Sequence, residues 1–376
     1  MKKWALRFAG FFAVLAVGGF LVAASGIIPI KASSGHWPIT QWLLRFGMHR
    51  SFATHSLGVD VPPLDDRNLI VKGATHYDFG CRSCHGSPGA RQPRVAQSMT
   101  PKAPDLVPLI PKWKPEQLFS LVKHGVKFTG MPAWPAQQRD DEVWAVVAFL
   151  QKMPMLDAAE YQELANGSPP PTAPIQTLTP TETMPPTAAA VNQYCVRCHG
   201  ADGLGRNTTV FPKLAGQRRE YLESALLAYA NGRRHSGVME PIAAGLDDTL
   251  IRELSAYYAG LPTPARPTPR VNTDQDVIAL GRRIAEEGIS AQRVPACIEC
   301  HGPTGRRMKP SYPSLAGQPA EYLVLQLELF KRGQRGGSPN AHLMQHVAPH
   351  LAAEEMRAVA RYFESLTSEE NQARRP

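Results

Sequence analysis

The cysteines constrain this 376-residue chain most, because all six lie in three copies of the pattern Cys-x-x-Cys-His. The copies are Cys81-Arg-Ser-Cys84-His85, Cys195-Val-Arg-Cys198-His199 and Cys297-Ile-Glu-Cys300-His301. Cysteines three positions apart lie on one side of a helical turn, where both thiols can add to the vinyl groups of one porphyrin. The histidine that follows points at the iron from the same turn. The pattern therefore predicts three covalently bound haem c groups, each with an axial histidine.

Two other interpretations of the cysteines are weaker. Three disulfides in an exported protein would not require a histidine after every second cysteine. Zinc binding is disfavoured because each motif offers three ligands and the motifs belong to separate units.

The N-terminus predicts a membrane anchor. Met1–Arg7 is basic, and Phe8–Ile30 then runs without a charge. As a helix that run would measure about 34 Å, against a hydrocarbon core of about 30 Å. Val22–Ser25 is a passable cleavage site, so removal as a signal peptide stays open. We expect a retained anchor in the bacterial inner membrane, with the haem units facing the periplasm.

Composition and repeats divide the chain into segments. After an anchor at 1–34, the Trp- and Leu-rich stretch 35–61 suits either a helix in the membrane interface or one packed on the first haem unit. A Pro- and Thr-rich stretch predicts a semi-rigid linker. The remaining segments are a first unit at 62–166, the linker at 167–190, a second unit at 191–262, a short Pro-rich linker at 263–274, a third unit at 275–368 and a polar tail at 369–376.

The second and third units are copies of each other. The segment 211–217, Phe-Pro-Lys-Leu-Ala-Gly-Gln, recurs at 312–318 as Tyr-Pro-Ser-Leu-Ala-Gly-Gln, and each copy precedes a helix-like run. Every unit has apolar runs with helical spacing, and no convincing alternating strand pattern occurs. We predict an all-α fold of three tandem units behind a transmembrane helix.

The sixth ligand of each iron separates an electron carrier from an enzyme with an open site. In each unit one methionine precedes the closing helix-like run: Met131, Met239 and Met344. Met131 and Met239 are predicted to lie in loops, and the closing run of the second unit is 248–260. The alternatives are Met99 in the first unit, His235 in the second, and His342, His346 or His350 in the third. The second nitrogen of each axial histidine also needs an acceptor, for which the carbonyls of Pro104, Pro212 and Pro313 are candidates.

The formal charge of +9 is an upper limit, because haem propionates would lower it. No stripe of basic residues with interleaved aromatics is present, so we expect no nucleic-acid partner.

These motifs resemble class I c-type cytochromes in all three units. Residues 189–368, with Cys195, Cys198, His199 and Met239 repeated as Cys297, Cys300, His301 and Met344, resemble the two-haem cytochromes of the c-four type. That resemblance implies two similar domains that face each other across a pseudo-twofold axis and pass electrons to terminal oxidases. The chain departs from the family by carrying an anchored unit in front.

We therefore expect an electron carrier and not an enzyme. Its expected partners are a quinol-oxidising complex or dehydrogenase as donor and a haem–copper terminal oxidase as acceptor. The main alternative is the cytochrome subunit of a periplasmic dehydrogenase complex. A haem peroxidase is less favoured, because every unit offers a sixth ligand.

Overall fold

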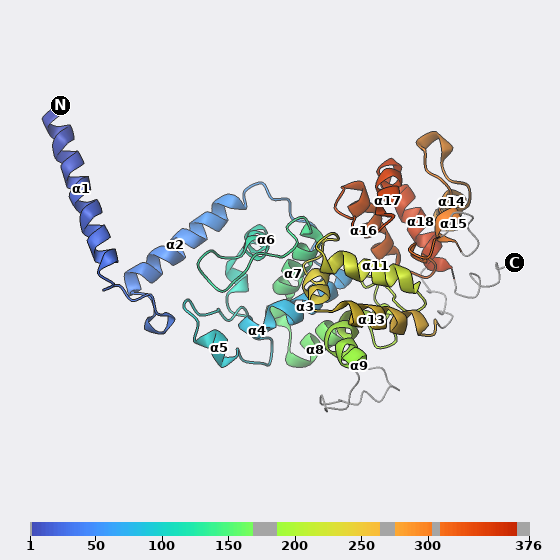
Figure 1. The fold of residues 1–376 in the computed structure, drawn as a ribbon, viewed down its shortest axis with the longest axis horizontal. Helices are drawn as coiled ribbons and strands as arrows, with labels where there is room; N and C mark the ends of the chain where they lie inside the picture. Colours follow the sequence, from blue (N-terminus) through green and yellow to red (C-terminus); the bar gives the residue numbers. More distant parts are fainter. Residues whose placement is uncertain (1, 168–185, 264–274, 303–308, 367–376) are drawn as a thin grey trace.

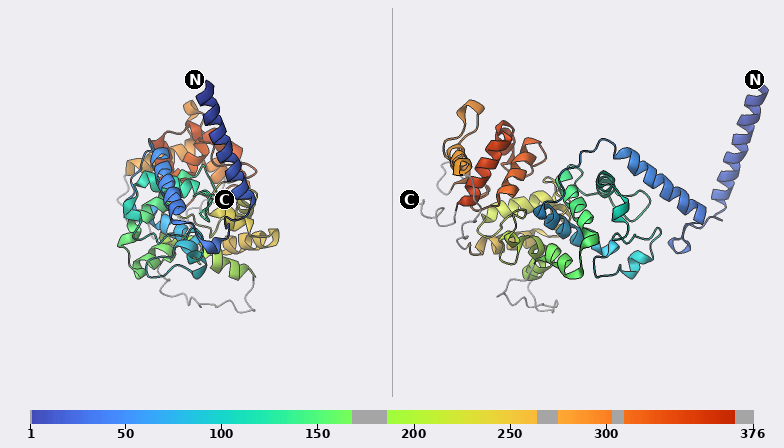
Figure 2. Two further views of the ribbon diagram at one scale, coloured as in Figure 1. Left: turned by 90° about the vertical axis from the view of Figure 1, so that its left-hand side faces the viewer. Right: turned by 180° about the vertical axis from the view of Figure 1, so that it is seen from behind.

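A computed structural model describes residues 2–167, 186–263, 275–302 and 309–366. Within these ranges the chain is helical and forms no β-strand, which confirms the all-α prediction. Three helical units follow two N-terminal helices, and the second unit lies between the first and the third (Figures 1 and 2).

The first unit is built on two crossing helices, α3 (Arg67–Gly80) and α7 (Asp140–Lys152). They cross closely because Gly73 has no side chain, and an added Cβ would overlap the backbone of Ala145. Asp66 caps α3, whereas three acidic residues open α7, where negative charge favours the helix N-terminus. The other helices are α4 (Arg82–His85), α5 (Arg94–Gln97), α6 (Pro115–His124) and α8 (Ala158–Asn166).

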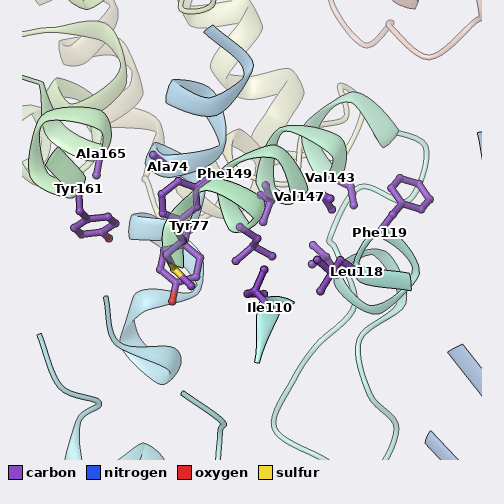
Figure 3. Close-up of a cluster of buried hydrophobic side chains, with 14 residues drawn as sticks. Ala74, Tyr77, Ile110, Leu118, Phe119, Val143, Val147, Phe149, Tyr161 and Ala165 are labelled. Atoms are coloured by element: carbon purple, nitrogen blue, oxygen red, sulfur yellow. The ribbon is translucent and has the colours of Figure 1, made fainter. Parts of the chain in front are cut away.

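The core of the first unit lies between these helices. Tyr77 from α3 and Phe149 from α7 have ring centroids 5.1 Å apart, and Tyr161 from α8 packs on the same phenyl ring (Figure 3). All three aromatic residues are almost fully buried. The core therefore joins α8, which follows the last predicted helix of the unit, to the crossing pair.

The second unit has a shorter first helix. α9 (Pro186–Ala190) continues into one π-helical stretch, Val191–Cys195, before the haem motif. α9 thus begins inside the segment predicted as a linker, because its side chains pack on α13 of the unit that follows. The remaining helices are α10 (Val196–His199), α11 (Arg219–Ala230), α12 (Met239–Ala244) and α13 (Asp248–Gly260).

The third unit repeats the crossing seen in the first. Gly281 of α14 meets the backbone of Ala358 in α18, again with no room for a Cβ. An aromatic side chain, Tyr362, lies beside this crossing, as Phe149 does in the first unit. The helices are α14 (Gln275–Glu287), α15 (Ile298–His301), α16 (Ala320–Lys331), α17 (Ala341–Val347) and α18 (Ala353–Ser365).

The N-terminal helices extend away from the three helical units (Figure 1). α1 (Lys2–Ala24) is long and apolar enough to cross a membrane, although a signal sequence would meet the same criteria. α2 (Pro38–His55) packs on the first unit near its end, where the His49 ring stacks on Trp113 at 4.4 Å. Nearer its start, Trp42 is 60% exposed. Packing and exposure thus occur on different parts of the same helix.

The second and third units meet through a reciprocal pair of glutamines. Gln217 accepts a bond from the Ser314 amide at 3.0 Å and donates to the Ser314 carbonyl at 2.7 Å. Gln318 does the same with Lys213, at 3.0 and 2.8 Å. In the sequence repeat Gln217 is equivalent to Gln318, and Lys213 is equivalent to Ser314. The contact therefore has the pseudo-twofold character that the resemblance implies.

Candidate functional site

Each Cys-x-x-Cys-His motif forms a short helical turn, α4, α10 or α15. The His85 amide donates to the Cys81 carbonyl at 2.9 Å, and the His301 amide donates to that of Cys297 at 2.9 Å. The first cysteine and the histidine are thus one turn apart, as the motif predicts.

The three motif histidines each make the same kind of hydrogen bond, from Nδ1 to a proline carbonyl. Nδ1 lies 2.9 Å from the Pro104 carbonyl for His85, 3.1 Å from that of Pro212 for His199, and 3.0 Å from that of Pro313 for His301. All three acceptors are the carbonyls proposed from the sequence.

This hydrogen bond determines which ring nitrogen of each imidazole carries the proton. A carbonyl only accepts, so Nδ1 carries the proton and Nε2 keeps its lone pair for a metal. Burial lowers the pKa of all three imidazoles, while the bond to the carbonyl opposes that shift. Burial therefore favours the neutral imidazole in all three units, and the bond to the carbonyl fixes the orientation of each ring.

No disulfide joins any of the six cysteines. Burial raises the pKa of Cys81 and Cys198 to about 12, and that of Cys195 and Cys297 to about 11. Elsewhere in the described ranges, no group of three or more His, Cys, Asp or Glu side chains is arranged to hold a metal ion.

A cavity of about 420 Å³ adjoins the first motif. It is lined by His85 and by apolar side chains that include Leu106, Met153 and Leu156. Tyr77 lies on the same wall, and its hydroxyl donates to the Gly86 carbonyl at 2.8 Å. Polar side chains, among them Arg91, Gln92 and Asp105, line the rest of it. A cavity with both apolar and charged walls suits a flat group that has an apolar body and charged edges, such as a porphyrin with its propionates.

Met131 lies in the loop between α6 and α7, as predicted. Its amide donates to the Thr129 hydroxyl at 3.1 Å, and its carbonyl accepts from Val126 at 3.1 Å. The terminal methyl of Met99, the alternative ligand, lies against the neighbouring Gly130. The structure thus brings both candidate methionines to one place.

Met239 is the first residue of α12 and not part of a loop. Its amide donates to the Ser236 hydroxyl at 3.1 Å. The alternative ligand His235 lies 3.3 Å from the Glu240 carboxylate through Nδ1. The methionine side chain is partly buried.

Met344 lies within α17 and packs against Phe330 and Ala348. The three histidines named as alternatives, His342, His346 and His350, are all exposed. This arrangement favours the thioether over an imidazole. The methionine assignments stay predictions in all three units.

The residues therefore fit haem c: paired thiols, a neutral oriented imidazole and a partly buried methionine occur in each unit. Sequence reasoning missed two buried carboxylates, Asp78 and Glu142, which connect the first unit to the second. Glu142 is one of three acidic residues in the first turn of α7, where negative charge is common. Nothing in the local sequence indicates its distant partner.

Comparison with known proteins identifies the class. The family described as cytochrome c oxidase, cbb3-type, subunit III matches residues 68–150 and 182–257, and the cytochrome c family matches 278–367. The chain belongs to the c-type cytochromes.

Its C-terminal half is similar to cytochrome c4 and its relatives. A thiosulfate dehydrogenase electron acceptor of Stutzerimonas stutzeri (strain A1501) is 36% identical over 185 residues, covering 47% of this chain and 80% of the relative. The cytochrome c4 of Thiocapsa roseopersicina is 34% identical and covers 48% and 90%. A solved cytochrome c4 of Acidithiobacillus ferrooxidans is 32% identical, covers 47% of this chain and all of that one, and superposes with a TM-score of 0.41.

Proposed function

We propose that this chain is a membrane-anchored cytochrome with three haem c groups, which carries electrons on the periplasmic side of the bacterial inner membrane. The observation that supports it best is the repeated motif geometry. Three times, two free cysteines and a histidine share one turn, and the histidine Nδ1 bonds to a proline carbonyl. When bound, haem c supplies one-electron redox chemistry.

The chain's own residues hold and tune that group. The six motif cysteines would attach it, and His85, His199 and His301 would bind the metal through Nε2. Met131, Met239 and Met344 are the proposed sixth ligands. Because a methionine with a histidine raises the reduction potential, three such sites would make a relatively oxidising carrier.

The direct test is the mass of the protein purified from a host that matures c-type cytochromes. We expect the polypeptide plus three haems, and a bare polypeptide would contradict the proposal. Met131→Ala should lower the midpoint potential of the first haem while the haem stays attached. Cys81→Ala should instead weaken the covalent attachment. If every midpoint is unchanged in the Met131 variant, that ligand assignment is wrong.

For the donor, the relatives favour a dehydrogenase. Two of them are named thiosulfate dehydrogenase electron acceptors, and they cover nearly half of this chain at 36% and 35% identity. We infer that a periplasmic dehydrogenase of this kind reduces the chain. Thiosulfate with purified dehydrogenase should reduce the cytochrome, and the dehydrogenase without thiosulfate should not.

For the acceptor, we propose a haem–copper terminal oxidase. The match of the first two units to a cytochrome subunit of a cbb3-type oxidase supports this choice. Copurification after detergent extraction would test it: an oxidase subunit in the complex supports the proposal, and a dehydrogenase catalytic subunit alone supports the dehydrogenase-subunit alternative. N-terminal sequencing of the same sample would show whether α1 is retained as the anchor.

A further inference from the structure

The first unit contacts the second over the segments that form the second haem site. On the second unit the contact residues are Arg197 and Cys198 of the motif, and Ser236 and Gly237 just before Met239. The motif and the methionine segment would bind opposite faces of one haem. A single surface of the first unit thus reaches both segments.

At the motif end, one buried carboxylate joins two haem motifs. Asp78 of α3 is 5% exposed. It pairs with Arg82 of the first motif at 2.9 Å and with Arg197 of the second at 2.6 Å. The Tyr161 hydroxyl also donates to this carboxylate at 2.7 Å. Asp78 therefore fixes the two motifs relative to each other.

At the methionine end, a second buried carboxylate makes the contact. Glu142, 3% exposed, accepts from the Ser236 hydroxyl at 2.7 Å and from the Gly237 amide at 2.6 Å. The Trp134 indole, three residues after Met131, donates to the same carboxylate at 3.1 Å. A Cβ added at Gly237 would overlap that indole ring. The two methionine-bearing segments are therefore packed tightly together.

Two arginines add bonds across the contact. Arg139 donates to the His235 carbonyl at 2.7 Å. The Arg206 guanidinium reaches the first unit at Thr75 Oγ1 and at the carbonyls of Glu163, Leu164 and Ala165, over 3.0–3.2 Å. Each arginine thus links its own unit to groups of the other.

Between these polar ends lies an apolar cluster. Val71 and Leu164 of the first unit pack there with Cys198, Val210 and Phe211 of the second. An apolar centre bordered by hydrogen-bonded buried charges is the pattern of a stable interface, not of a passing encounter.

We propose that the first unit is a permanent cap on the haem-bearing face of the second unit. An outside protein that exchanges electrons with the second unit would have to approach its motif and methionine segments, and the first unit covers both. Outside redox partners are therefore restricted to the first and third units. The inference rests on the proposed function, because it assigns that function's docking surfaces.

A wedge variant tests the cap in the full-length, haem-loaded protein. Gly237→Ala places a Cβ against Trp134, whereas Gly260→Ala, in the same unit, meets nothing within 4 Å and serves as the control. Hydrogen exchange of amides in 196–199 and 236–239 should be several-fold faster in Gly237→Ala than in the control. A soluble single-haem cytochrome should also oxidise the second haem several-fold faster, and the midpoint of that haem should fall as water reaches it.

Arg206→Gln covers the case in which Gly237→Ala disturbs Met239, because Arg206 bonds to α3 and α8 and not to the methionine segment. Loss of the methionine–iron absorption band would reveal such a disturbance. The cap is refuted if both variants keep three haems and that band, yet exchange and react like the Gly260 control. Absence of haem from the parent protein would instead refute the proposed function.

Discussion

The two contacts that hold the three units in line are built from different chemistry. Between the second and third units, Gln217 and Gln318 bond reciprocally to backbone, so both halves use the same residue type. Between the first and second units, buried Asp78 and Glu142 come from one side only. The contact between the second and third units reflects duplication of one surface, whereas the contact between the first and second units requires two different surfaces.

The charged contact also explains why the first unit docks on the second and not on the third. Arg197 faces Asp78, and the equivalent position of the third motif is Glu299. A second carboxylate at that place would repel Asp78 and disfavour docking. The second position after the first motif cysteine, Arg197 in one unit and Glu299 in the other, thus contributes to which unit the first unit contacts.

Reversing that charge should have the largest effect. In Arg197→Glu a carboxylate replaces the cation that pairs with buried Asp78, so we expect a loss of about 3–5 kcal/mol in the free energy of unfolding. Denaturant unfolding of the first two units measures it. Haem attachment should persist, because the third motif itself carries Glu299. The control Glu299→Arg should change stability by less than about 0.5 kcal/mol; equal losses would disprove the asymmetry.

Acid should destabilise the first unit through His76. This buried α3 residue lies with its ring centroid 6.0 Å from that of Trp134, and burial together with the Lys72 charge lowers its pKa from 6.5 to about 3. The unfolded chain takes up a proton below pH 6.5 and the folded chain does not, so stability falls between pH 6.5 and about 3. His76→Leu should remove a few kcal/mol of that dependence. Unchanged thermal unfolding profiles across this pH range would contradict it.

Removing one glutamine should have an intermediate effect. Gln318→Ala leaves the amide and carbonyl of Lys213 without these partners at the contact, which costs about 1–3 kcal/mol. Because the contact is reciprocal, Gln217→Ala should cost a similar amount. Calorimetric unfolding of both variants checks this, and a marked inequality would show that the pseudo-symmetry is not energetic.

The smallest effect should come from Ser314→Ala. Gln217 bonds to the backbone of this residue and not to its hydroxyl, so stability should stay within about 0.5 kcal/mol of the parent protein. The same unfolding measurement decides it. A clear loss would mean that the contact recognises the side chain.

Periodicity and motif spacing sufficed for α13 and for the histidine acceptors. Pro212 and Pro313 were found because the requirement is local: an imidazole with a metal on one nitrogen needs an acceptor on the other, a short distance along the chain. α13 was predicted with its observed bounds for the same reason, since its apolar spacing is a property of one segment.

The contacts between units could not be predicted in this way. The partners of Asp78 and Glu142 lie about 100 residues away, and an acidic residue in a helix gives no sign of which distant group it meets. The sequence predicts a loop at Met239, before the closing helix, as it does at Met131. Instead α12 begins at Met239, with Val238 as its N-cap residue, and the Met239 amide donates to the Ser236 hydroxyl.

The glutamine pair sets a limit on how such a chain can be extended. A self-complementary surface is used up once its two copies have met, so no further unit can join through it. A junction made of unlike surfaces has no such closure. A further haem unit could therefore be added only through a contact between two unlike surfaces. Each addition would need a new complementary surface.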